Sequence, residues 1–293
     1  MQDQQHARLM RLATRAALAV ALTLVLAKAI AWWLSGSVSL LAGLTDSLLD
    51  SAASLINLVA VHFALRPADE DHRYGHGKAE ALAGLAQALF IGISAIVIAL
   101  QGLERLRSPQ ALDAEGAGIA VMLLSLALTV ALLSLQRKVV RETGSTAIHA
   151  DSLHYRSDIL LNSSILVALL LTHFGWQQMD ALFALGIALY IFWSAISIVR
   201  GAVAVLMDEE LPSETSQHMQ QVASAVPGVL GVHDLRTRIS GTRWFVQLHL
   251  ELPGQMSLSE AHAHCEAVEQ AIHQHYPRAE VLVHADPQEV VRH

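Results

Sequence analysis

The chain has little charge and almost no cysteine. Only 15% of its 293 residues are charged, whereas a typical soluble domain carries about 25%. The single cysteine, Cys265, excludes an intramolecular disulfide. Charge is absent from residues 117–135 and 181–199, and 16–34 contains only Lys28. Because roughly 20 apolar residues in a helix cross the hydrocarbon core of a bilayer, the sequence predicts a membrane protein.

Six segments have the length and apolar character of membrane helices. A short basic stretch precedes the first of them, as in a signal peptide, but its apolar run is too long and five more follow. We therefore interpret it as the first span. The predicted spans are 12–34, 38–65, 81–103, 115–135, 146–173 and 179–202.

Lys and Arg are absent from the first and fifth connections between these spans. The third connection carries two, Arg105 and Arg107, whereas the N-terminal tail and the second and fourth connections carry nine. Because cytoplasmic loops are enriched in Lys and Arg, both termini are predicted to lie in the cytoplasm. The nine residues are Arg8, Arg11, Arg15, Arg66, Arg73, Lys78, Arg137, Lys138 and Arg141.

After residue 208 the composition changes to that of a water-soluble domain. Residues 209–293 hold 11 of the 26 acidic residues and 9 of the 16 histidines. Apolar alternation, a turn at 240–242 and a capping box at Ser257 and Glu260 predict a ferredoxin-like α+β domain of the αββαβ type. Its elements are a helix at 212–225, strands at 229–239 and 243–252, a helix at 258–275 and a strand at 279–285. The predicted domains are therefore 1–208, within the membrane, and 209–293, in the cytoplasm.

Two pairs of titratable residues interrupt apolar spans. Asp46 and Asp50 lie in the second span, and His154 and Asp158 in the fifth. The spacing of four places each pair on one helical face. A carboxylate near the bilayer centre costs about 2.5–3.5 kcal/mol, which a divalent cation would offset. Since the two spans run in opposite directions, the pairs are expected at similar depth, and three carboxylates with one imidazole suit tetrahedral zinc.

Other polar residues of the spans are interpreted as packing contacts or interfacial groups. Asn57, Asn162 and Lys28 can hydrogen-bond to neighbouring helices, and Lys28 could alternatively extend to the interface. Asp151 and Arg156, towards the inner end of the fifth span, are interpreted as interfacial partners and not as ligands.

Two groups of metal-binding residue types lie outside the spans. In the second connection, Asp69, His72 and His76 have a spacing suited to one metal ion, with a solvated charged loop as an equal alternative. In the tail, the turn places His233 opposite His249, and alternate residues of the last strand share a face. The tail candidates are His233, His249, His262, His284 and Asp286, with His262 on the helix expected to cover the sheet. The remaining tail histidines are interpreted as surface residues.

These motifs together resemble the cation diffusion facilitator family, and His72-Arg-Tyr-Gly-His76-Gly-Lys-Ala-Glu80 is similar to its bacterial zinc and ferrous-iron efflux branch. The resemblance implies a homodimer in the inner membrane that exchanges cytoplasmic Zn2+, Cd2+ or Fe2+ for protons. It implies that the two intramembrane pairs form the transport site, and that the loop and the tail hold further sites. The tail site would be binuclear and lie at the dimer interface, and Lys78 and Asp208 would form a salt bridge between protomers.

The identity of the metal stays open at this point. Imidazole favours Zn2+, Cd2+ or Fe2+, whereas carboxylates also suit Mn2+, so zinc is expected first and ferrous iron is the main alternative. A membrane metalloenzyme is disfavoured because the sequence has no His-Glu-x-x-His motif. A metal sensor would not need four ligands at mid-bilayer. We therefore expect a secondary transporter and not an enzyme, with no nucleic-acid partner.

Overall fold

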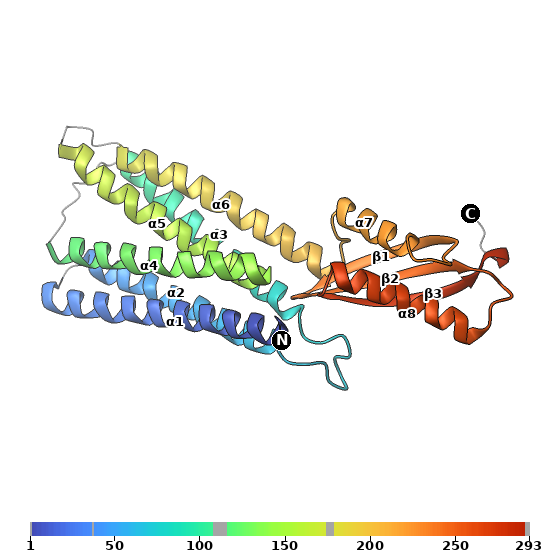
Figure 1. The fold of residues 1–293 in the computed structure, drawn as a ribbon. Coiled ribbons are helices and arrows are strands. Elements are labelled where there is room, and N and C mark those ends of the chain that lie inside the picture. The colour runs from blue at the N-terminus through green and yellow to red at the C-terminus, as the bar shows by residue number, and fades with distance from the viewer. Residues whose placement is uncertain (1, 37, 108–115, 174–178, 291–293) are drawn as a thin grey trace. The chain divides into compact units, whose positions relative to one another are not determined.

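The computed structural model describes residues 2–36, 38–107, 116–173 and 179–290, and divides into two compact units, 1–202 and 203–293. The first unit consists of long helices and the second of a small sheet with two helices (Figure 1). The boundary between the two units lies within α6 (Met179–Leu206), close to the change of composition near residue 208. Each unit is built around its own core.

Six helices form the first unit. Five of them are long and apolar enough to cross a membrane, and over its described residues α5 is the exception because it carries Asp151, Arg156 and Asp158. Helix α1 begins ten residues earlier, and α4 ends eight residues later, than the predicted spans, since helices continue where apolar sequence stops. The helices are α1 (Gln2–Ser35), α2 (Val38–Ala64), α3 (Ala79–Arg107), α4 (Gly116–Thr143), α5 (Thr146–His173) and α6.

Small side chains let the helices of the first unit approach closely. Helix α1 packs along α2 and α4, and α5 packs against α3 and α4. On α1 the buried face includes Ala13, Ala17 and Ala21, spaced by one turn. On α3, a Cβ at Gly102 would lie 3.2 Å from Leu185 of α6, so glycine keeps that contact close. Helices α2 and α5, which carry the candidate transport ligands, are thus held within one bundle.

The second unit is the predicted α+β domain. Its strand order is β1-β2-β3, with β1 antiparallel and β3 parallel to β2, and the strand that follows α8 extends two residues beyond the prediction. The predicted turn is present, with Gly241 at φ 60. The elements are α7 (Ser213–Ser224), β1 (Gly231–Ser240), β2 (Arg243–Leu252), α8 (Leu258–His275), β3 (Ala279–Pro287) and the short 3-10 helix η1 (Gln288–Val290).

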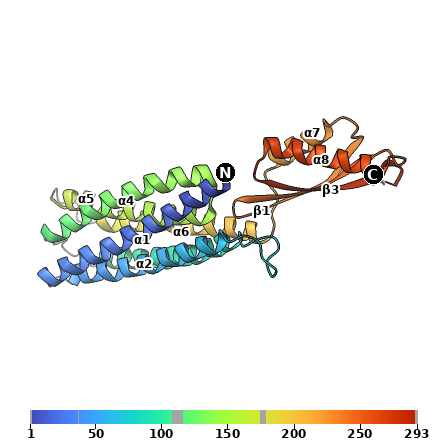
Figure 2. The same cartoon turned by 60° about the horizontal axis from the view of Figure 1, so that its bottom comes forward.

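One face of this sheet is covered by both helices (Figure 2). Alternate residues of β2, including Val246, Leu248 and Leu250, are buried against α7 and α8, as the alternation in sequence predicts. The capping box that begins α8 is also confirmed, since Ser257 and Glu260 exchange hydrogen bonds. The opposite sheet face stays open and presents the other residues of each strand.

Candidate metal sites

Helices α2 and α5 bring three candidate ligands together in the first unit. Asp50, His154 and Asp158 each offer one ligand atom within 4.8 Å of the other two. The Nε2 atom of His154 lies 2.9 Å from Asp50 Oδ1 and 3.8 Å from Asp158 Oδ2. Only 7% of His154 is exposed. The helical spacing of four puts His154 and Asp158 on one face of α5, opposite Asp50. We call these three residues the intramembrane triad.

Asp46 lies one turn before Asp50 and is not part of this triad. It is exposed on the single chain, although its charge acts on both Asp50 and Asp158. Beside it, the Lys28 ammonium donates hydrogen bonds to Gly43 O at 3.0 Å and to Ser47 Oγ at 2.6 Å. Lys28 therefore makes an interhelical contact between α1 and α2, as one of its two interpretations expected.

Contacts from neighbouring helices fix the orientation of α5 beside the triad. The buried Tyr155 hydroxyl lies 3.0 Å from Ser54 Oγ on α2 and donates to Ala17 O on α1 at 3.4 Å. One turn beyond Asp158, Asn162 donates to the Asp158 backbone carbonyl of the same helix at 2.9 Å, and not to the neighbouring helix that was expected. The Tyr155 hydrogen bonds restrict rotation of α5, and so they position the imidazole and carboxylate that it carries.

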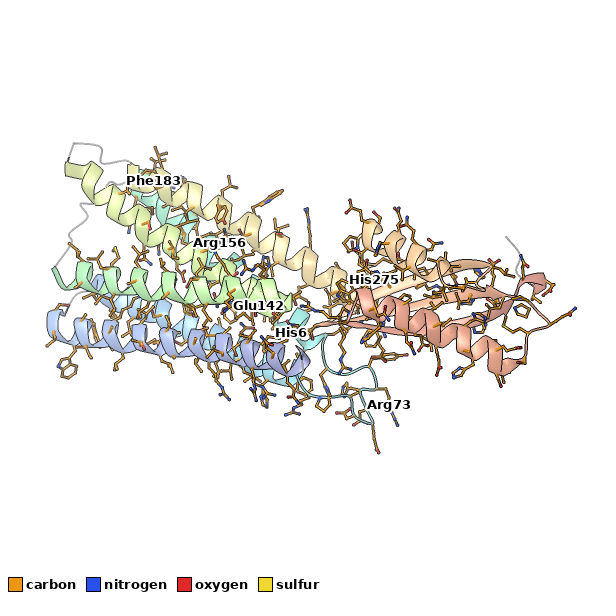
Figure 3. The ribbon with its side chains drawn as sticks, viewed as in Figure 1. His6, Arg73, Glu142, Arg156, Phe183 and His275 are labelled. Atoms are coloured by element: carbon orange, nitrogen blue, oxygen red, sulfur yellow. The ribbon has the colours of Figure 1, made fainter. Side chains whose placement is uncertain are left out.

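The loop between α2 and α3 is largely exposed, but Asp69, His72 and the buried His76 lie close together in it. Asp69 Oδ1 accepts the backbone N–H of His72 at 2.7 Å, and its Oδ2 lies 3.3 Å from His76 Nε2. The hydrogen bond from the His72 backbone holds the pKa of Asp69 below its usual value. The His76 ring packs edge-on against Phe63, and its buried Nδ1 makes no hydrogen bond. Arg73, labelled in Figure 3, belongs to the same loop.

The tail candidates form a row across the open face of the sheet. Strand register places His233 opposite His249 and His249 opposite His284, which confirms the predicted pairing across the turn. Asp286 Oδ2 lies 2.7 Å from His249 Nδ1 and 3.5 Å from His233 Nε2, and its Oδ1 lies 3.2 Å from His284 Nε2. Burial raises the pKa of Asp286, but its hydrogen bond to His249 and the nearby imidazoles lower it overall. The carboxylate is thus ionised at neutral pH.

The structure does not bring His262 to this row. Its Nε2 lies 3.3 Å from Glu266 Oε1 on the same helix, and 71% of its side chain is exposed. The reason is that α8 covers the apolar sheet face, whereas His249 and Asp286 project from the other face. Within one chain, His262 therefore lies outside the tail cluster. His293 lies outside the described residues.

Comparison with known proteins assigns both units. Residues 14–207 match the cation efflux transmembrane domain, and residues 211–288 match the cytoplasmic domain of cation efflux proteins. The chain belongs to the cation efflux family. The resemblance to cation diffusion facilitators inferred from the motifs is thereby confirmed.

Relatives in this family match nearly the whole chain. The cation-efflux pump FieF of Klebsiella pneumoniae subsp. pneumoniae is 50% identical over 289 residues, covering 99% of this chain and 96% of the relative. FieF of Yersinia enterocolitica is 49% identical with the same coverage. Among solved structures, the Zn form of CzrB shares 33% identity over 30% of this chain and all of its own, with a TM-score of 0.28. The chain is thus a multi-pass membrane transporter that exports metal cations.

The interpretation of Asp151 as an interfacial residue is wrong. Asp151 is only 1% exposed and accepts hydrogen bonds from the side-chain amides of Gln87 on α3 and Gln136 on α4. Arg156, labelled on α5 in Figure 3, is exposed. Sequence spacing placed both residues near the end of the span, but it did not show that amides from two other helices converge on Asp151.

Two carboxylates that support the candidate ligands were missed. Glu251, only 5% exposed, lies with Oε1 3.0 Å from His233 Nδ1, as outer carboxylates do in metal–histidine sites. A Cβ at the paired position, Gly231, would lie 2.6 Å from the Glu251 carboxyl carbon, so glycine leaves the space it needs. The spacing of two between His249 and Glu251 was the available signal, because alternate strand residues share a face.

The second missed carboxylate, Glu80, joins α3 to the beginning of α5. It is 2% exposed, and its Oε2 accepts the Ser145 hydroxyl and, at 3.5 Å, the Ala147 N–H. A carboxylate is favourable at this place because the first N–H groups of a helix lack intrahelical acceptors and carry partial positive charge. Glu80 therefore anchors the helix that carries His154, four residues after the loop residue His76.

Asp208, which was predicted to form a salt bridge with Lys78 of a second protomer, contacts Arg238 of its own chain. Asp208 Oδ1 accepts a hydrogen bond from Arg238 Nη1 at 3.4 Å. Asp208 has φ 56, in the left-handed region, directly after α6. The pairing of Lys78 with Asp208 of a second copy stays a prediction.

Proposed function

We propose that this protein exports cytoplasmic Zn2+, and also Cd2+, across the inner membrane in exchange for protons, with Fe2+ as the alternative cargo. The observation that carries the proposal is the intramembrane triad, in which ligand atoms from α2 and α5 converge to within 4.8 Å inside an apolar bundle. Ionised carboxylates in such a place require a compensating positive charge. A divalent cation supplies it, and its arrival and departure make a transport cycle.

The donor set supports zinc as the first substrate. One imidazole and two carboxylates are already close, and Asp46 is one turn away on α2. We infer that closure of α2 against α5 brings Asp46 in as the fourth ligand, which completes a tetrahedral set. Opening of the same contact on the other side would release the ion. Zinc and cadmium accept nitrogen and oxygen ligands readily, and ferrous iron accepts them with lower affinity.

Protons compete with the metal for the same atoms. His154 must be neutral, and Asp50 and Asp158 ionised, before they can coordinate. Imidazoles are suited to this exchange because they generally change charge near pH ~6.5. With both termini in the cytoplasm, as the distribution of Lys and Arg predicts, metal binds from the cytoplasm and incoming protons displace it outwards.

The tail row supports a regulatory metal site in a homodimer. Three imidazoles and the ionised Asp286 on an open sheet face fit the donors that zinc takes, and Glu251 orients His233 among them. We infer that His262 of a second copy completes this site, because it cannot reach the row within one chain. Metal in the tail would then draw two protomers together. Asp69, His72 and His76 would hold an additional ion at the loop.

The experiment is a flux panel in proteoliposomes that contain a pH reporter. Zn2+, Cd2+, Fe2+ and Mn2+ are supplied in turn, and metal uptake and internal pH are recorded together. We expect Zn2+ and Cd2+ uptake with a matching movement of protons in the opposite direction, and weaker Fe2+ uptake. Zinc flux with no change of internal pH would contradict proton exchange, whereas a preference for Fe2+ would make iron the cargo.

A further inference from the structure

Four helices contribute to a buried polar cluster beside the intramembrane triad. It consists of Asp151 on α5, Asn57 on α2, Gln87 on α3 and Gln136 on α4, and we call it the carboxamide cluster. Gln136 Nε2 donates to Asp151 Oδ2 at 2.7 Å, and Gln87 Nε2 donates to Oδ1 at 3.3 Å. The Asn57 amide lies beside the same carboxylate. All four residues are buried.

Two amide oxygens of this cluster are unpaired. Gln136 Oε1 and Asn57 Oδ1 are buried and make no hydrogen bond. Buried polar groups are rarely left in this state. Protonation of Asp151 would satisfy one of them, because its new O–H can donate to an amide oxygen while the amide N–H groups still donate to its other oxygen.

The partners of Asp151 suit a group that changes its charge. A lysine or arginine beside the carboxylate would hold it ionised. A carboxamide instead presents N–H groups to a carboxylate and, after rotation of the amide, its oxygen to a carboxylic acid. Gln87 and Gln136 can therefore satisfy Asp151 in either state.

The charged and titratable groups that act on Asp151 belong mainly to the triad. His154 on the same helix attracts the Asp151 carboxylate electrostatically, whereas Asp50 on α2 repels it. Tyr155 of α5 also interacts electrostatically with Asp151. The elements α3 and α4 present Gln87 and Gln136 to it. His154 lies three residues along α5, which is one helical turn. A divalent cation held by the triad would therefore favour the ionised form of Asp151.

We propose that the carboxamide cluster is a proton-binding site distinct from the cation ligands. Asp151 holds a proton when the triad is free of metal and releases it to water when a divalent cation binds. When the cation leaves, a proton from water rebinds to the carboxylate. The proposal rests on the proposed metal–proton exchange and assigns one of the exchanged protons to a residue that does not coordinate metal.

The test counts protons released per zinc bound by the full-length protein in detergent and weak buffer. Asp151→Asn keeps the side-chain shape and an acceptor oxygen for the glutamines but cannot release a proton. We expect its release to fall by about one proton per protomer, which is one for each zinc bound at the triad, while zinc still binds there. Glu104→Gln, which removes an exposed carboxylate of α3, should leave the count unchanged.

Infrared difference spectra provide a second measurement. Zinc should remove a carboxylic-acid C=O band in the wild type, the band should be absent from Asp151→Asn, and Gln136→Met should shift its frequency. An unchanged proton count in Asp151→Asn, or a band that neither variant affects, would overturn the proposal and leave a buried water as the missing donor. If the wild type itself released no protons on binding zinc, the proposed exchange would fail instead.

Discussion

The intramembrane triad and the tail row use the same donor chemistry on different scaffolds. The triad is built on two helices, with its imidazole buried and Asp46 still one turn away. The tail row is built on hydrogen-bonded strands that fix His233, His249 and His284 in register on an open sheet face. Helices in a bundle can move past one another, whereas paired strands cannot move without breaking their ladder. The scaffold therefore suits the triad to binding and release, and the tail row to retention of metal.

Asp50→Ala should impair the triad and leave the tail row intact. Loss of a residue that only orients a metal ligand already costs up to about 100-fold in affinity or activity. Loss of a ligand carboxylate from the triad should therefore reduce zinc flux by more than that. Zinc binding to the tail should be unaffected. Proteoliposome flux and equilibrium zinc binding would be measured on the same preparation, and flux near the wild-type level would remove the triad from the mechanism.

The double replacement His233→Ala with His284→Ala should impair the tail row and leave the triad intact. It removes two imidazoles from the tail row, so the dependence of flux on low zinc concentrations should weaken while flux at saturating zinc persists. The measurement is flux against free zinc for the wild type and the variant. Identical curves would indicate that metal in the tail is structural and does not regulate transport.

Glu251→Gln should sharpen the account of the tail row without removing a ligand. The amide orients His233 less strongly than the carboxylate, so tail zinc affinity should fall by about 10- to 100-fold. Calorimetric titration would measure the affinity. The matched control is Glu280→Gln, which removes an exposed carboxylate from β3, and an equal loss in that control would show a general charge effect.

Glu80→Gln should have the smallest effect. It removes the negative charge from the beginning of α5 while keeping a hydrogen-bond acceptor, so we expect destabilisation of about 1 kcal/mol. The thermal midpoint should fall, and more than in the control Glu104→Gln. An unchanged midpoint would mean that the Ser145 hydroxyl and backbone N–H groups find equivalent partners without the charge.

Local patterns predicted most of the fold. Long uncharged runs marked the membrane helices, and alternation along 243–252 with the capping box at Ser257 marked the tail elements, because these signals depend only on neighbouring residues. The spacing of four predicted that Asp46 and Asp50 share a face of α2, and that His154 and Asp158 share a face of α5. Of the four predicted ligands the structure brings together Asp50, His154 and Asp158, and leaves Asp46 outside the group. The row of His233 and His249 followed from the position of one turn.

Contacts between distant segments could not be predicted in this way. Asp151 was wrongly assigned to the interface. Its position in α5 gave no sign of its amide partners, which come from α3 and α4. His262 was expected over the histidines, but periodicity does not say which sheet face a helix covers. Glu80 is about 65 residues before the helix that it anchors. In each case the deciding partner is remote in sequence, so no local pattern contains it.

The central claim is that a divalent cation is bound by Asp50, His154 and Asp158 inside the bundle. X-ray absorption at the zinc edge tests it directly, in full-length protein with His76→Ala, His233→Ala and His284→Ala to weaken the other sites. The account predicts retained zinc with a single imidazole and otherwise oxygen ligands, and loss of that zinc on adding Asp50→Ala. Zinc coordinated by several imidazoles, or absent altogether, would contradict it.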